Sequence, residues 1–149
     1  MAQLEATGAD IYLVASATST TTKAACTTAI ASGKRLIKTT TLGDIGGTRA
    51  VTEKKYLSPD DSEKVLGSIS YGNIAVEMPF NATDTAGQTE MRTIFGDRTE
   101  RKAIIKETDG NFTVFPVKCS AFFKAYAIDE FVMFKGTLEQ NGAHTDVTA

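Results

Sequence analysis

The chain has 149 residues, of which 42% are hydrophobic and 23% are charged, and its formal net charge is −2. This composition is typical of one globular domain, and the charge balance argues against a protein that binds nucleic acid tightly by neutralising phosphates. No apolar run approaches the roughly 18 residues of a membrane-spanning helix, and the first residues, MAQLEATGADIYL, lack the basic-then-apolar order of a secretion signal. We therefore expect a chain that is made and kept in a cytoplasm.

Two strands are expected in the first 43 residues. Residues 10–16, DIYLVAS, form a short apolar run typical of a strand, and residues 35–43, RLIKTTTLG, alternate enough to form another strand that ends at Gly43. Residues 17–35 lie between them and are dominated by Thr, Ser and Ala. These residue types favour turns and weak strands over helix in this context.

Residues 44–64, DIGGTRAVTEKKYLSPDDSEK, are predicted to form a long loop. The segment contains Gly-Gly and Ser-Pro-Asp-Asp turn signals and many charges, and only Val51, Tyr56 and Leu57 could anchor it. A loop of this length without structure of its own is uncommon in a compact domain and is usually functional or mobile. The segment is therefore a candidate functional element.

A strand and a helix are expected next. Residues 65–80, VLGSISYGNIAVEMPF, show strand alternation with an irregularity at Gly72. Residues 85–96, TAGQTEMRTIFG, predict the single helix of the chain, because Thr85 and Gln88 form a capping-box pair and Gly96 stands where a helix stop is expected. The apolar stripe of this helix indicates core packing rather than a ligand site. It consists of Met91, Ile94 and Phe95.

The C-terminal part is predicted to contain a long hairpin. Asp109-Gly110 indicates a tight turn before it, and a second turn is expected near residues 128–130. The two-residue period places seven residues from Thr113 to Ala125 on one face, six of them apolar, and the other face is half apolar. Arms of about 14 residues would extend on the order of 45 Å. Five or six strands and one helix cannot cover both faces, so we expect part of this surface to contact another molecule.

Candidate catalytic and metal-binding residues are few. The single histidine, His144, lies in a polar tail, LGDIGGTRA lacks the spacing and lysine of a phosphate loop, and SPDDSE lacks the calcium-loop pattern. Cys26 and Cys119 are too few and too far apart for a zinc motif or a disulfide framework, so we expect two free thiols, with Cys119 on a buried strand face. No catalytic residue, cofactor or metal is predicted, and an enzyme is not expected.

The ordered series of these segments resembles the major tail tube proteins of long-tailed bacteriophages, the lambda-like siphophage group in particular. The long loop between the second and third strands of that family is similar to TTTLGDIGGTRAVTEKKYLSPDDSEKVLGS, residues 39–68. Its strand, Gly-Gln helix and Asp-Gly hairpin are similar to residues 73–115, which begin NIAVEMPF. Its final hairpin is similar to VKCSAFFKAYAIDEFVMFKGTLEQNG, residues 117–142. Together the similar segments cover roughly residues 36–142, and the order of the segments carries the resemblance.

The resemblance implies a single tail tube domain over residues 1–149, without an added C-terminal immunoglobulin-like domain. The implied fold is mostly β: a two-sheet antiparallel β-sandwich or partial barrel with one flanking α-helix, a long C-terminal hairpin and a long loop at about 44–64. The implied function is that of a structural virion protein. Its subunits form hexameric rings that stack into the tail tube, and DNA passes through the lumen into the host cell without specific binding.

The implied partners are further copies of the chain, a tape-measure protein, a tail terminator and tail-tip proteins, with no membrane insertion. The implied locations are the virion tail and, during assembly, the host cytoplasm. Two sets of assembly residues follow from the resemblance. The loop that reaches the adjacent ring would use Tyr56, Leu57, Pro59, Asp60 and Asp61. The hairpin between neighbouring subunits would use Phe122, Tyr126, Phe131 and Met133.

Two alternatives stay open at this point. The first is the inner tube protein of a contractile tail, a tailocin or a secretion system, which shares the fold. The second is a monomeric β-sandwich binding module that uses the 44–64 loop to hold a ligand.

Overall fold

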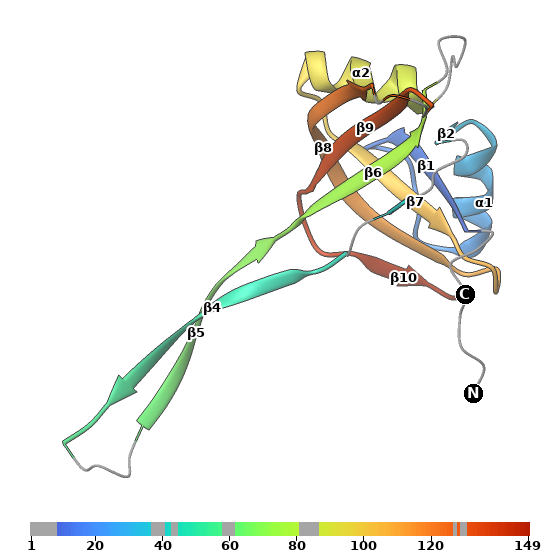
Figure 1. The fold of residues 1–149 in the computed structure, drawn as a ribbon. Coiled ribbons are helices and arrows are strands. Elements are labelled where there is room, and N and C mark those ends of the chain that lie inside the picture. The colour runs from blue at the N-terminus through green and yellow to red at the C-terminus, as the bar shows by residue number, and fades with distance from the viewer. Residues whose placement is uncertain are drawn as a thin grey trace.

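The computed structural model describes residues 9–36, 41, 42, 45–57, 62–80, 87–126, 128 and 131–149. These residues form strands and two helices, mostly arranged in one curled antiparallel sheet (Figure 1). In chain order the elements are β1 (Asp10–Ala15), α1 (Lys23–Ala31), β2 (Lys34–Arg35), β3 (Thr41–Leu42), β4 (Gly47–Lys55), β5 (Ser62–Tyr71), β6 (Asn73–Pro79), α2 (Gly87–Asp97), β7 (Arg101–Lys106), β8 (Phe112–Ala125), β9 (Met133–Gln140) and β10 (Thr145–Val147).

The main sheet has the strand order β2-β1-β7-β8-β9-β6-β3, and β10 pairs with the start of β8. Strand β8 organises the sheet, because its first half pairs with β7 through Val117 and its second half pairs with β9 from Val117 to Ala125. The sheet curls into a partial barrel, so the predicted mostly β partial barrel is confirmed. Strands β4 and β5 pair only with each other and form a separate ribbon that projects from the body (Figure 1).

Helix α1 is the first difference from the sequence prediction, which placed turns and weak strands at residues 17–35 and expected one helix in the chain. The Thr22 hydroxyl caps the helix by accepting a hydrogen bond from the Ala25 amide at 3.1 Å. Inside the helix, the Thr27 hydroxyl donates to the carbonyl of Lys23 at 2.9 Å and so does not compete with the helical ladder. Cys26 is fully buried, and this tertiary contact supports a helix that the Thr-rich pattern conceals.

Each face of the sheet carries its own apolar core, and each core includes one helix. Neighbouring residues Leu13 and Val14 enter different cores, as expected for alternating strand positions. The larger core contains Met91 and Ile94 of α2, whereas the smaller core contains Cys26 of α1 together with residues of β7, β8 and β10. The apolar residues on both faces of the first half of β8 are therefore covered within the chain. The sequence argument counted one helix and therefore left out α1, which covers one face of this half of β8.

The C-terminal hairpin is shorter than predicted, since β9 has eight residues and only the second half of β8 pairs with it. A β-bulge between Cys119 and Ala121 also exchanges the faces of the strand. Phe122 now points into the core, where its ring meets Phe95 edge to face at 4.9 Å, and Phe123 is 62% exposed. The predicted face that ran unbroken from residue 113 to 125 is wrong because the two-residue period does not survive a bulge.

The strands on either side of the projecting ribbon differ in part from the prediction. The expected irregularity at Gly72 is confirmed, and it divides the predicted strand into β5 of the ribbon and β6 of the main sheet. In place of one strand over residues 35–43, the structure has the two short strands β2 and β3. Residues 37–40 and Gly43 lie outside the described part of the chain.

Helix α2 and the turn after β7 agree with the sequence patterns, except that Phe95 of the predicted core stripe is 43% exposed. Met91 and Ile94 are fully buried, and the Gln88 side chain donates to the Pro79 carbonyl at 2.9 Å, whereas Thr85 lies outside the described residues. The helix ends one residue beyond the predicted stop, at Asp97 before Arg98 in the left-handed region. Within the described chain, neither helix is long and apolar enough to cross a membrane. The Asp109-Gly110 turn is confirmed, with Gly110 at φ +88°.

Close packing of α2 on β9 leads to a stability prediction at Gly136. A Cβ atom at this position would clash with Cε of Met91. We expect Gly136→Ala to lower the free energy of unfolding by about 1 kcal/mol, measured by urea denaturation. This is the low end for overpacking, because the clashing atom is the end of the flexible Met91 side chain. Gly96→Ala is the matched control, because a Cβ there meets nothing within 4 Å and alanine favours helix. Equal stability of the two variants would contradict the packing of α2 described here.

Candidate assembly surfaces

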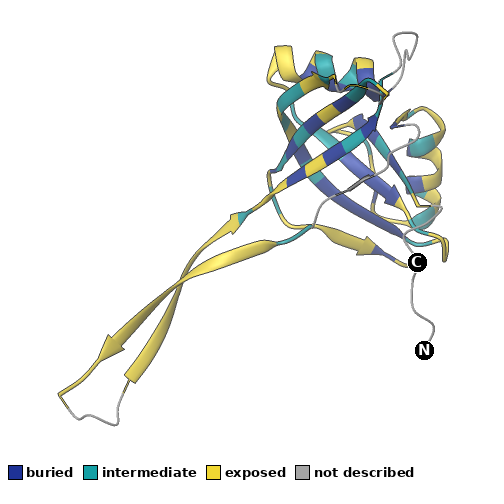
Figure 2. Cartoon of the chain, in the orientation of Figure 1, coloured by how far each residue is buried: buried dark blue, intermediate teal, exposed yellow. Residues whose placement is uncertain are grey.

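The ribbon formed by β4 and β5, called the arm below, extends away from the curled sheet. All residues of β4 are exposed, and so are those of β5 except Tyr71, which is half-buried (Figure 2). The predicted loop at about 44–64 is therefore wrong, because most of the segment is a β-hairpin. Opposite charges face each other across it, Glu53 with Lys64 and Lys54 with Glu63. This mirrored charge order was a signal for pairing, but charges on both faces concealed the strand alternation.

One face of the arm is apolar. Alternate residues of β4 share this face with their partners on β5, and an irregularity after Arg49 keeps the face continuous. Val51 is 57% exposed, Leu66 63% and Ile69 44%, and their burial would remove a continuous apolar strip from water. The residues of this apolar arm face, which is the part of the face nearer the body, are Gly47 opposite Tyr71, Arg49 opposite Ile69, and Val51 opposite Leu66. Farther from the body the same side of the ribbon becomes polar, with Glu53 opposite Lys64 and Lys55 opposite Ser62.

The other face of the arm is mostly polar. Thr48 lies opposite Ser70, and Thr52 lies opposite Val65, which is the one large apolar residue among these pairs. The arm is therefore an amphipathic ribbon, and only its apolar face requires a partner surface.

Two of the residues predicted for the ring-stacking loop, Tyr56 and Leu57, follow directly after β4, at the end of the arm away from the body. Tyr56 is half exposed, and its hydroxyl donates to Glu63 at 2.6 Å, which raises the pKa of Tyr56. Leu57 is fully exposed. The other three members, Pro59, Asp60 and Asp61, lie outside the described residues.

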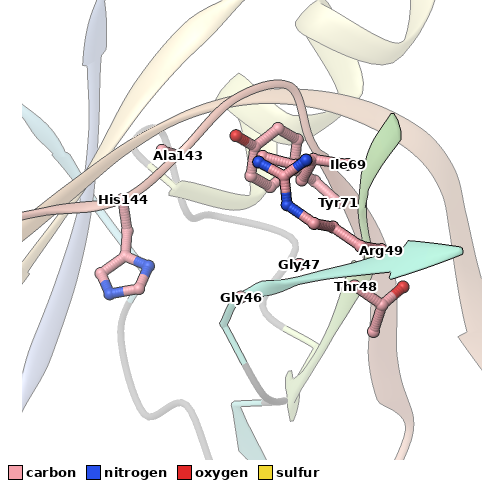
Figure 3. Close-up of a pocket in the computed structure, with 8 residues that line it drawn as sticks. All are labelled: Gly46, Gly47, Thr48, Arg49, Ile69, Tyr71, Ala143 and His144. Carbon is pink, nitrogen blue, oxygen red and sulfur yellow. The ribbon is translucent and has the colours of Figure 1, made fainter. Parts of the chain in front are cut away.

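An open hollow of about 390 Å³ lies where the arm joins the body (Figure 3). Its walls include Arg49 and Tyr71 of the arm and His144 from the segment before β10. The imidazole of His144 points away from Arg49 and Tyr71 in Figure 3, and the side chain is exposed. Within the described part of the chain, no group of three or more His, Cys, Asp or Glu residues could hold a metal ion.

A second apolar surface lies at the turn of the C-terminal hairpin. Two of the four residues predicted for the inter-subunit hairpin are exposed there, Tyr126 by 74% and Phe131 by 84%. The other two are partly covered within the chain: Phe122 packs against the chain's own core, and Met133 is half-buried between neighbouring strands. Sequence reasoning missed two exposed members: Phe123, because the bulge was not foreseen, and Ile128 in the turn. This hairpin end consists of Phe123, Tyr126, Ile128 and Phe131.

Cations link β8 and α2 to Phe80, the residue that follows β6, on the helix side of the sheet. The Lys124 ammonium lies 4.2 Å from the centre of the Phe80 ring, and the Arg92 guanidinium lies 5.3 Å from the same ring and 5.9 Å from that of Phe134. Cation–π contacts of this kind contribute about 0.5–1 kcal/mol each at partly exposed sites. They join β8, β9 and α2 to Phe80 next to the hairpin end.

The sheet has open edges on both sides of the β8-β9-β6 portion. Strand β7 pairs with β8 only as far as Val117, and no described strand pairs with that side of β8 from Lys118 to Ala125. On the other side, β3 pairs with β6 only at Val76 and Glu77. Unpaired strand edges of this length are templates for pairing with another chain.

Solved structures match this arrangement over nearly the whole chain. A chain of the SPP1 tail tube is similar with a TM-score of 0.70 and 11% identity, over 99% of this chain and 80% of that one. A chain from the tail of an empty gene transfer agent (GTA) particle, refined with C6 symmetry, has a TM-score of 0.68 and 16% identity, over 99% and 100% of the two chains. The chain has the tail tube fold. By sequence, no family model and no curated protein matches it.

The tail tube fold also occurs in contractile machines. A chain from the sheath/tube terminator of PVC, an extracellular contractile injection system, has a TM-score of 0.70 and 8% identity, over 99% of each chain. At this level of identity the similarity establishes the fold, and the arm and the hairpin end are interpreted from their own geometry.

Both cysteines are free in the tail tube fold observed here, as predicted. Cys26 is fully buried, whereas Cys119 is half-buried on β8. Burial raises the pKa of both thiols, and the nearby Lys102 charge opposes this effect at Cys26. A raised pKa leaves less thiolate at neutral pH, so neither cysteine is an activated nucleophile.

Proposed function

We propose that the chain is a structural, non-enzymatic tube subunit that assembles with copies of itself into the tail tube of a phage or phage-like particle. The observation that carries this proposal is the arm. An isolated two-stranded ribbon is marginally stable in water, and this ribbon exposes an apolar strip to solvent. Contact with another molecule would bury the strip and hold the ribbon.

The proposed occupant of the apolar arm face is a second copy of the chain in an adjacent ring. Support comes from the similar chain in a GTA tail with C6 symmetry, which sets the expectation of six subunits in each ring. Six arms per ring would bury the same strip six times. Many repeated contacts of modest size can stabilise a long assembly without any single strong one.

The open sheet edges support closure within each ring. One edge lies on β8, from Lys118 to Ala125, and the other lies on β6. Because these are different surfaces, pairing the β8 edge of one subunit with the β6 edge of the next gives a head-to-tail contact, which closes into a ring when the rotation is right. The β8-β9-β6 portions would then form one continuous barrel.

The face of β8, β9 and β6 that lies opposite α2 is the proposed lumen wall. Its charged residues come in equal numbers of each sign, and the Lys135 ammonium lies 3.9 Å from the Glu77 carboxylate. A balanced wall attracts phosphates weakly, so DNA can slide through without specific binding and with little counterion release. The four charged residues are Lys118, Lys135, Glu77 and Glu139.

The proposed location is the virion, reached after assembly in the host cytoplasm, and the proposed partners are a tape-measure protein, a tail terminator and tail-tip proteins. No cofactor takes part. A second candidate function is the inner tube of a contractile system, which is favoured by the similarity to the PVC terminator chain. A sheath gene beside the gene for this chain would support the contractile reading.

Negative-stain electron microscopy of the purified chain, across a series of protein and salt concentrations, tests the proposal. We expect hollow tubes of uniform width or six-fold rings. In the monomer, hydrogen exchange should be fast across the arm, because it lacks tertiary cover. Single particles at every concentration, combined with strong protection of the arm, would contradict the tube and favour a monomeric binding module.

A further inference from the structure

We infer that Gln140 is a positioning residue that sets the direction of the arm before any second subunit binds. The positioning role rests on the proposed function for its purpose, because the arm is proposed to dock on another copy. The arrangement itself is a property of the single chain.

Gln140 contacts both points at which the arm joins the body. Its side-chain Oε1 accepts a hydrogen bond from the Gly46 amide at 3.1 Å, just before β4. Its backbone amide donates to the carbonyl of Gly72 at 3.1 Å, just after β5. Its Nε2 donates to the Gly142 carbonyl at 2.8 Å and thereby ties in the segment that follows β9. One residue, 5% exposed, thus links three parts of the chain, two through its side chain and one through its backbone amide.

The two junctions need such a restraint because they are glycines without packing partners. A Cβ atom at Gly46 or at Gly72 would meet nothing within 4 Å, so packing does not explain glycine at either position. Glycine leaves the backbone with wide freedom. The two junctions are also joined by a hydrogen bond, which the Gly72 amide donates to the Gly46 carbonyl at 3.3 Å. Because both ends of this hydrogen bond move together with the arm, it does not fix the direction of the arm.

A bond from the body to a junction restrains that direction, and Gln140 provides one at each junction. These bonds act beside the packing of Ile45 against the larger core and the pairing of Asn73 with Glu139. Gln140 is the last residue of β9, which is paired on both sides within the sheet. An arm held in one direction loses less conformational freedom when it docks, which favours association.

The test compares two buried glutamines. Gln140→Met keeps the length of the side chain and removes its two hydrogen bonds. Gln88→Met is the matched control, because Gln88 is also buried and also donates to a backbone carbonyl, that of Pro79, far from the arm in the chain. Spin labels at Thr52 of the arm and Thr93 of α2, in a chain with both native cysteines replaced by alanine, report the arm direction in the monomer.

We expect a narrow label-to-label distance distribution in the parent chain and in Gln88→Met, and a broad one in Gln140→Met. Hydrogen exchange at the Gly46 amide should quicken about 10-fold or more in Gln140→Met only. An unchanged distribution in Gln140→Met, or equal broadening in both variants, would overturn the positioning role. If Gln140→Met does not fold, exchange at Gly46 in the parent chain decides: protection supports the role, and exchange at the rate of a free amide overturns it.

These readouts use the monomer, so they are independent of whether tubes form. Where the parent chain forms tubes, we expect Gln140→Met to need about 10-fold more protein for tube growth, because the docking-competent direction is then only a fraction of the population. Failure of the parent chain to form tubes under any condition would count against the proposed function. The positioning role of Gln140 would then be judged from the label-to-label distances in the monomer alone.

Discussion

Val51→Glu combined with Leu66→Lys is expected to abolish tube growth and to leave the monomer folded. The two residues face each other across the arm on its apolar face. The new pair imitates the Glu53 and Lys64 pair beside it, so the ribbon keeps an attractive cross-strand contact and an unchanged net charge. Burying two charges at an interface built for apolar contact costs several kcal/mol per subunit. Electron microscopy measures the tubes, and urea denaturation should show a change within about 0.5 kcal/mol.

The matched control is Thr52→Glu combined with Val65→Lys. This pair occupies the next register position, carries the same charges and lies on the opposite face of the arm. We expect it to form tubes close to the parent yield. Loss of tubes in both variants would show that the apolar face is not the specific docking face. Normal tubes from Val51→Glu/Leu66→Lys would remove the arm from the interface.

Phe131→Glu is expected to prevent ring formation while the monomer stays folded. Phe131 is 84% exposed at the hairpin end, so the charge is solvated in the monomer and would have to be buried between subunits. Sedimentation velocity distinguishes monomers from rings. Thr93→Glu on the exposed side of α2 introduces the same charge away from the sheet edges and should leave assembly unchanged.

Met133→Glu is a different kind of variant. Met133 is half-buried between Ala125 of β8 and Pro79 of β6, so a carboxylate there should lower the free energy of unfolding of the monomer by about 1–3 kcal/mol. Rings that form normally from Phe131→Glu would exclude this part of the hairpin end from the inter-subunit contact. The result for Met133→Glu would not change that conclusion, because this variant reports on the stability of the monomer.

Several features of this chain could be predicted from sequence because their causes are local. The Asp109-Gly110 turn requires a residue with positive φ, and Gly110 supplies it. The buried stripe of α2, with Met91 and Ile94, follows from helical spacing, and the division of the strand at Gly72 follows from the missing side chain. The ordered series of these local features is also what made the resemblance to tail tube proteins visible.

The remaining features depend on contacts between distant segments, which no local pattern encodes. Helix α1 is stabilised by burying Cys26 against β7, β8 and β10, and the bulge that turns Phe122 inward is selected by the rings of Phe95 and Phe134. The arm is recognisable as a hairpin only from the pairing register of β4 and β5. The point where it joins the body is held by a hydrogen bond between Gly46 and Gln140, which are 94 residues apart in the chain. Sequence thus determined where local turns and stripes lie. Tertiary packing decided which apolar residues the chain covers itself and which it leaves exposed.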